Sequence, residues 1–144
     1  MNKIVVIGSL NLDVIQNISR LPLQGETLRV DSRGTNLGGK GANQAVAAAR
    51  QGADVSFIGA IGQDAAGVQF RNLLADEGIN TAGLVEKEDA TGTATILLEE
   101  DGHNTILVYG GANMKLTADD VVKSEQLIAE ADFVIAQFEV AQEA

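Results

Sequence analysis

The chain has 144 residues, a length that suits one globular domain, and its 45% apolar content excludes a disordered or fibrous protein. It has no cysteine, so disulfide bridges, thiolate metal sites and cysteine nucleophiles are excluded. The net charge of −10, with scattered lysines and arginines, argues against nucleic acid as a partner and favours a small molecule. The lack of cysteine also suits a cytoplasmic location. No uncharged apolar stretch reaches the ~18 residues of a membrane span, so we expect no membrane partner.

The first half of the chain alternates strands with helices. Residues 3–8, KIVVIG, form a β-branched run that ends in glycine, which predicts a strand buried on both faces of a mostly parallel sheet. Residues 13–37 instead mix apolar and polar residues around the only proline, which is typical of an antiparallel ribbon. Helices are predicted over 41–51 and 64–77, with a strand over 54–62 between them.

The second half predicts a hairpin, a helix and a final strand. Two β-rich runs, 91–100 and 104–109, flank the turn sequence Asp-Gly-His, which is a strong hairpin signal. A Thr-x-x-Asp pattern at Thr117 predicts the start of a helix that reaches about Ala131. Residues 132–139, DFVIAQFE, predict another buried strand.

Together these elements predict an α/β fold with a separate β flap. The strands and helices of 1–12, 38–92 and 110–144 form the layered core, and the antiparallel segments 13–37 and 93–109 form the flap. The last strand is followed by the helix-forming residues VAQEA without a terminating signal. We therefore expect the chain to be the amino-terminal part of a longer protein.

A glycine-rich segment, 34–43 (GTNLGGKGAN), is the first candidate site. It nearly fits a phosphate-binding P-loop, but Gly41 stands where a magnesium-binding hydroxyl is required. It does not fit a dinucleotide fingerprint, because it follows a ribbon and not a core strand. Two interpretations remain: a tight turn, or a helix start where backbone amides, Lys40 and Asn43 meet a hydroxyl-rich or partly anionic ligand.

Three further polar residues lie at the ends of predicted strands. Asn11 and Asp13 follow the first strand, and Glu139 ends the last one. Singly, each fits an Asx turn, a cap or an exposed strand end. Because strand ends and the helix start meet at one edge of a parallel sheet, we expect these residues to share a cleft. His103 belongs to the hairpin tip and is expected to be solvated.

The segment 38–64, GGKGANQAVAAARQGADVSFIGAIGQD, resembles the amino-terminal signature of the ribokinase-like carbohydrate kinases. GSLNLDV near the start and TGTATILLEEDGHNTILVYGGAN after residue 90 are also similar to that family, so the resemblance covers essentially the whole chain. It implies the amino-terminal, incomplete part of a doubly wound α/β sheet with a small antiparallel β lid. Family members hold a sugar between the sheet and the lid.

The resemblance also implies which residues meet the sugar and which functions lie elsewhere. Carried over by position, the sugar-binding residues are Asn11, Asp13, Gly38, Gly39, Lys40, Asn43 and Glu139, and the apolar lid contacts are Ala94, Ile96 and Val108. No catalytic residue and no metal ligand is expected in this chain. The family's catalytic aspartate, its nucleotide site and its cation site lie in a carboxyl-terminal half, so ATP, Mg²⁺ and K⁺ are expected only in the full-length protein. The chain alone is expected to be inactive.

The leading hypothesis is that the parent protein phosphorylates the 5-hydroxyl of D-ribose with ATP, and that this chain selects and encloses the sugar. The alternatives are a kinase for deoxyribose, fructose or adenosine, and a non-catalytic sugar-binding module. The resemblance also implies a homodimer formed through the lid. An exposed strand edge and an exposed apolar face for helix docking predict that an isolated 144-residue product is poorly soluble or associates.

Overall fold

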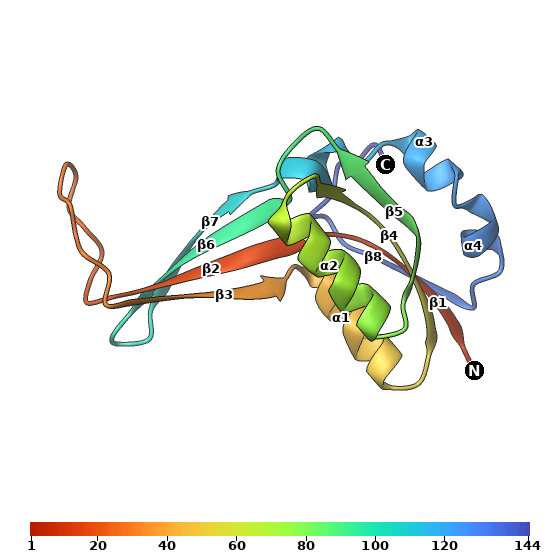
Figure 1. The fold of residues 1–144 in the computed structure, drawn as a ribbon, viewed down its shortest axis with the longest axis horizontal. Coiled ribbons are helices and arrows are strands. Elements are labelled where there is room, and N and C mark those ends of the chain that lie inside the picture. Colours follow the sequence, from red (N-terminus) through yellow and green to blue (C-terminus); the bar gives the residue numbers. More distant parts are fainter.

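Two four-stranded sheets, joined end to end, make up the structure, a computed structural model that describes residues 1–144 (Figure 1). The first sheet has the order β5-β4-β1-β8 and the second the order β3-β2-β6-β7. The strands are β1 (Lys3–Ile7), β2 (Asn11–Ile18), β3 (Ser32–Gly38), β4 (Asp54–Gly62), β5 (Asn80–Lys87), β6 (Gly92–Glu99), β7 (Asn104–Tyr109) and β8 (Phe133–Ala136). The helices are α1 (Lys40–Arg50), α2 (Ala65–Asp76), the 3₁₀ helix η1 (Gly111–Lys115), α3 (Ala118–Val122) and α4 (Glu125–Ala129).

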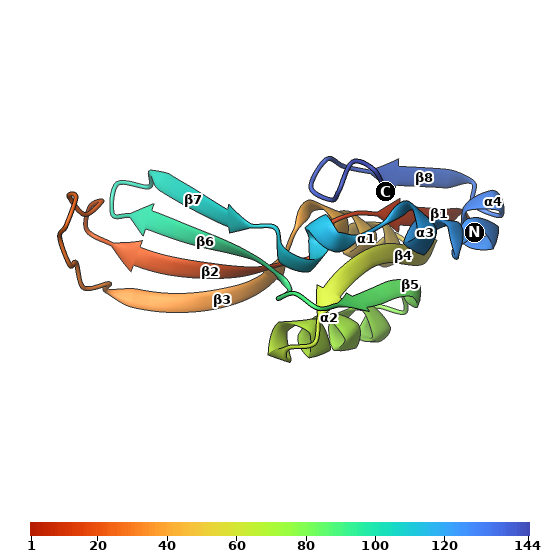
Figure 2. The ribbon, with the colours of Figure 1, turned by 90° about the horizontal axis from the view of Figure 1, so that it is seen from above.

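The first sheet, called here the core sheet, is parallel throughout. β1 pairs with β4 on one side and with β8 on the other, and β4 pairs with β5. Helices α1 and α2 cover one face, and η1 and α3 lie toward the other (Figure 2). This arrangement confirms the predicted α/β fold with a parallel sheet.

Most of the hydrophobic core lies between the core sheet and the first two helices. Phe57 of β4 and Phe70 and Leu74 of α2 are completely buried there. Phe70 and Leu74 are four residues apart and therefore share one face of the helix. Asp64 caps α2 by accepting a hydrogen bond from the Gly67 backbone N–H at 2.8 Å.

No helix combines the length and the apolar character needed to cross a membrane.

The second sheet, called here the lid, projects away from the core sheet (Figure 1). The pairs β2–β3 and β6–β7 are antiparallel, as predicted, but β2 and β6 pair in parallel. The lid is therefore a mixed sheet, in which the two predicted antiparallel pairs are joined by a parallel pairing that was not predicted. The physical reason is that β2 and β6 both leave the core sheet and run outward, so their shared edge can only be parallel.

Three other elements differ from the sequence prediction. The helix expected over 117–131 divides into α3 and α4, because Ser124 adopts a non-helical backbone conformation. The strand expected to be buried over 132–139 is the shorter β8, whose Phe133 and Val134 are exposed because it forms an edge of the core sheet. The strand β5 has weak alternation and was not predicted.

Candidate functional site

The candidate site lies where the lid joins the core sheet, at the amino-terminal end of α1. The loop before this helix packs against the turn between β1 and β2. Gly39 has a φ of 93°, and a Cβ atom there would lie 2.8 Å from both the Asn11 nitrogen and the Ser9 carbonyl oxygen. Glycine is therefore required at this position for both backbone conformation and close approach. The tight turn is therefore confirmed. That this helix start also meets a ligand stays a prediction.

Glu139 forms the centre of a polar group at the place where the lid meets the core sheet, called here the joint. Its Oε2 accepts a hydrogen bond from the Ser9 hydroxyl at 2.5 Å and one from the Lys40 backbone N–H at 3.3 Å. Its Oε1 lies 3.2 Å from the Lys40 ammonium nitrogen. Burial raises the pKa of Glu139, but the hydrogen bonds from Ser9 and Lys40 outweigh burial and lower it below its usual value. Glu139 is therefore an anion at neutral pH.

Asp13 adds a second carboxylate to the same joint. Its Oδ2 lies over Gly38, where a Cβ atom would come within 2.4 Å of it. Partial burial raises the pKa of Asp13, and the negative charge of Glu139 raises it further. Glu139 thus lies near enough to Asp13 for the two negative charges to interact. No hydrogen bond within the chain occupies the Asp13 side chain, so it is free to accept one from a ligand.

Asn11, at the start of β2, is buried beside these residues. Only 6% of it is exposed, and its Oδ1 accepts a hydrogen bond from the Asn113 amide at 2.8 Å. Neither Ser9 nor Asn113 was identified as a site residue from the sequence. Ser9 directly follows the first strand, where a ligand-facing loop is expected, and this position was the signal that could have found it. Asn113 gave no local signal, because its partners lie more than 100 residues away.

The register of the lid strands places the predicted apolar contacts on the face that carries Asp13. Ala94 of β6 is paired with Asp13, and Val108 of β7 is paired with Ala94. Directly paired residues point to the same face of a sheet, and so does Ile96, two residues beyond Ala94. Ala94 is buried, whereas Val108 is 65% exposed. The lid thus presents an apolar surface next to the two carboxylates.

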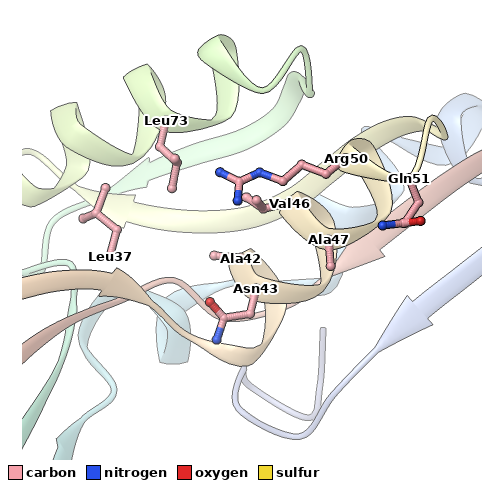
Figure 3. Close-up of a pocket in the computed structure, with 8 residues that line it drawn as sticks. All are labelled: Leu37, Ala42, Asn43, Val46, Ala47, Arg50, Gln51 and Leu73. Carbon is pink, nitrogen blue, oxygen red and sulfur yellow. The ribbon is translucent and has the colours of Figure 1, made fainter.

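Asn43 lies apart from the hydrogen-bonded group around Glu139. It sits on the first turn of α1 and lines a hollow of about 500 Å³ between α1, α2 and the end of β3 (Figure 3). Figure 3 shows Leu37, Ala42 and Leu73 around this hollow, with Arg50 extending toward Leu73, whereas the Asn43 amide points away from these side chains. Contact of Asn43 with a ligand stays a prediction.

The chemistry of the joint suits a neutral, hydroxyl-bearing ligand. Asp13 and Glu139 accept hydrogen bonds, whereas the Lys40 ammonium and the Asn11 amide donate them. Two carboxylates against one ammonium disfavour a polyphosphate at this position. No three His, Cys, Asp or Glu side chains lie close enough together to hold a metal ion.

Comparison with known proteins shows the family of the chain. The profile of the pfkB family carbohydrate kinases matches residues 1–139. The chain is 45% identical over 143 residues to a bifunctional ribokinase/ribose-5-phosphate isomerase A of Fructilactobacillus sanfranciscensis, covering 97% of this chain and 26% of that protein. It is 43% identical over 141 residues to a ribokinase of Staphylococcus aureus, covering 96% of this chain and 46% of that protein.

A solved structure has the same fold. The ribokinase of Arabidopsis thaliana complexed with ribose and ATP superimposes with a TM-score of 0.84 at 36% identity, over 97% of this chain and 46% of that one. The chain thus spans about half the length, or less, of the relatives that it matches. It belongs to the pfkB family of carbohydrate kinases.

Proposed function

We propose that the protein phosphorylates D-ribose with ATP, and that residues 1–144 supply the sugar-binding joint and the lid. The observation that carries this proposal is the gathering of Asp13, Lys40 and Glu139 beside the apolar face of the lid. Relatives at 43–45% identity are ribokinases, and the Arabidopsis relative holds ribose and ATP.

Sugar binding in this proposal depends on matched donors and acceptors. Each sugar hydroxyl can donate to a carboxylate oxygen of Asp13 or Glu139 and accept from the Lys40 ammonium or the Asn11 amide. Ala94, Ile96 and Val108 cover the sugar with apolar surface, which excludes water and strengthens these hydrogen bonds. Lys40 neutralises part of the charge of Glu139, and this pairing keeps the carboxylate in a fixed orientation.

In the proposed reaction, ATP is bound by the full-length protein and not by the residues of the joint. ATP supplies the phosphoryl group, with Mg²⁺ and K⁺ as its accompanying cations. The residues of the joint do not fit a triphosphate, because two carboxylates would repel it. No chemical step through ATP is therefore assigned to these residues.

Calorimetry on the full-length protein tests the substrate. We expect ribose to bind more tightly than deoxyribose, fructose or adenosine, and ATP-dependent formation of ribose phosphate to follow. Glu139→Gln should weaken ribose binding by about 1.5 to 3 kcal/mol, because the negative charge that strengthens the hydrogen bonds of this side chain is lost. Glu143→Gln, an exposed glutamate four residues on, is the matched control and should bind ribose normally. Tight adenosine binding without ribose binding would overturn the substrate, and ribose binding without turnover would favour a non-catalytic module.

A separate variant tests whether Asn43 contacts the sugar. If the amide of Asn43 donates to a sugar hydroxyl when the lid closes, Asn43→Ala should weaken ribose binding by about 1 to 3 kcal/mol. Gln44→Ala, its exposed neighbour on the same helix, is the control. An unchanged ribose affinity in Asn43→Ala removes this residue from the site.

We further propose that two copies associate through their lids. The edge strand β7 carries four exposed apolar side chains, Ile106, Leu107, Val108 and Tyr109, which are 50–65% exposed. A second copy would cover this apolar strand and its unpaired edge. Sedimentation equilibrium should show a dimer that Leu107→Lys converts to a monomer. A wild-type protein that stays monomeric at high concentration would refute the dimer.

A further inference from the structure

Asn113 is a buried polar residue that the sequence did not point to. It lies in η1, the short connection between the lid and the second half of the core (Figure 2), and only 1% of it is exposed. Its Oδ1 accepts from the Leu10 backbone N–H at 3.0 Å, and its Nδ2 donates to the Leu10 carbonyl at 3.1 Å. The side chain therefore binds both backbone groups of Leu10, much as a neighbouring strand would.

The second hydrogen of the Asn113 amide determines how Asn11 is oriented. Nδ2 of Asn113 donates to Oδ1 of Asn11 at 2.8 Å. Because Oδ1 of Asn11 is held in this way, its Nδ2 must point in the opposite direction. That amide nitrogen takes part in no hydrogen bond within the chain and is not among the buried polar atoms that lack a partner. Asn11 is thus held with a free N–H donor, beside the acceptors Asp13 and Glu139.

The backbone of Asn113 contacts the segment that carries Glu139. Its carbonyl oxygen accepts a hydrogen bond from the Ala141 backbone N–H at 3.3 Å. Gly92, the first residue of β6, packs against the side-chain amides of Asn113 and Asn11. A Cβ atom at Gly92 would lie 2.2 Å from Nδ2 of Asn113 and 2.3 Å from Oδ1 of Asn11. Asn113 therefore connects β2, β6 and the Glu139 loop. Its contacts leave no room for a residue larger than glycine at position 92.

We propose that Asn113 is a positioning residue for sugar binding: it holds the Asn11 amide with its N–H toward the ligand and ties Asn11 to the Glu139 loop. This inference rests on the proposed function, because it assigns the ligand of the joint to a sugar. Asn113 itself does not touch the sugar. Its effect on binding passes through Asn11.

A double-mutant cycle on the full-length protein tests this route. Asn113→Ala and Asn11→Ala should each raise the dissociation constant for ribose about tenfold or more, since each removes at least one hydrogen bond from the site. The double variant should bind no more weakly than Asn11→Ala alone, because Asn113 acts through that residue. Fully additive losses would overturn the proposal.

A stability-matched control separates positioning from general destabilisation. Leu116→Ala removes a buried side chain from the same connection, outside the site, and should lower the unfolding midpoint without changing the ribose affinity. Asn113→Asp keeps the size of the side chain but cannot donate to Oδ1 of Asn11, so it should also weaken ribose binding about tenfold. Normal affinity in Asn113→Asp would overturn the proposal.

A readout without sugar distinguishes failure of this inference from failure of the proposed function. In the ¹H–¹⁵N spectrum of the ligand-free protein, the side-chain amide signals of Asn11 should shift in Asn113→Asp and stay in place in Leu116→Ala. Wild-type protein that binds no pentose, with these shifts present, would refute the sugar but support the positioning role. Unchanged Asn11 signals in Asn113→Asp would refute the positioning role whatever the ligand.

Discussion

The core sheet and the lid are built from similar residues but are buried very differently. β4 of the core sheet, with sequence DVSFIGAIG, has seven buried positions out of nine, whereas no position of β7, with sequence NTILVY, is buried. Both strands contain isoleucine and valine side chains. The difference arises because α1 and α2 cover the core sheet, whereas no helix covers β7 (Figure 1). Burial thus depends on the neighbouring layer and not on the apolar content of a strand.

This contrast explains where the site is placed. The core sheet and α1 fix Ser9, Lys40 and Glu139 on a packed frame, whereas Asp13 and the apolar contacts extend from the less buried lid. A site at the joint combines preorganised polar groups with a surface that can approach the ligand. Four substitutions test the contrast.

The largest effect is expected in the core. Phe70→Ala removes a completely buried aromatic ring from α2 and should lower the free energy of unfolding by about 3 to 5 kcal/mol. Urea denaturation measures this loss. Val68→Ala, on the same helix but 59% exposed, is the control and should change stability by less than about 0.5 kcal/mol. Similar losses in both variants would contradict the burial assigned to this helix.

An ion pair between the core sheet and α3 should make the core sensitive to acid. The Asp120 carboxylate lies 2.6 Å from the Lys87 ammonium and accepts hydrogen bonds from the backbone and hydroxyl of Thr117. Desolvation raises the pKa of Asp120, but hydrogen bonds from Lys87 and Thr117 outweigh it and lower the pKa to about 2.

The folded-state pKa of Asp120 lies below the value of about 3.9 in the unfolded chain, so its stabilisation is present above pH ~4 and is lost as the pH falls toward 2. Asp120→Asn should lower stability at pH 7 by about 1.5 to 3 kcal/mol and reduce the loss between pH 4 and 2. Urea denaturation across this range measures both. Asp119→Asn, an exposed neighbour, should keep the wild-type pH dependence.

A larger side chain at Gly92 should lower both the stability and the ribose affinity of the joint. Gly92→Ala places a methyl group against the amides of Asn113 and Asn11 and should cost about 1 to 3 kcal/mol of stability. It should also weaken ribose binding, which calorimetry can detect. Gly34→Ala is the matched control in the lid, because its Cβ would meet no atom within 4 Å. Normal binding and stability in Gly92→Ala would show that the contacts around Asn113 are loose.

The smallest effect is expected on the outer strand of the lid. Leu107 is 61% exposed, so Leu107→Ala should change the unfolding free energy of a single chain by less than about 0.5 kcal/mol. Denaturation at low protein concentration measures this value. A loss above 1 kcal/mol that grows with protein concentration would instead reveal that a second copy covers this residue.

Local sequence signals predicted most of the elements. The β-branched run at 3–8, the alanine-rich helix that closes at Gly52 and the Asp-Gly turn at the hairpin were all correct, because each depends on neighbouring residues. The break at Ser124, the exposure of β8 and the parallel pairing of β2 with β6 were not predicted. These features depend on which segments meet in space.

The same division holds for the site. The sequence by itself determined the polar residue types at the strand ends and at the helix start, and hence the expectation of a hydroxyl-bearing ligand. Only the tertiary structure decided that Ser9 and Lys40 hold Glu139, that Asn113 orients Asn11 and that Asn43 lies at the border of another hollow. The physical reason is that periodicity and turn propensity act over a few residues, whereas these hydrogen bonds join residues 99 to 130 positions apart.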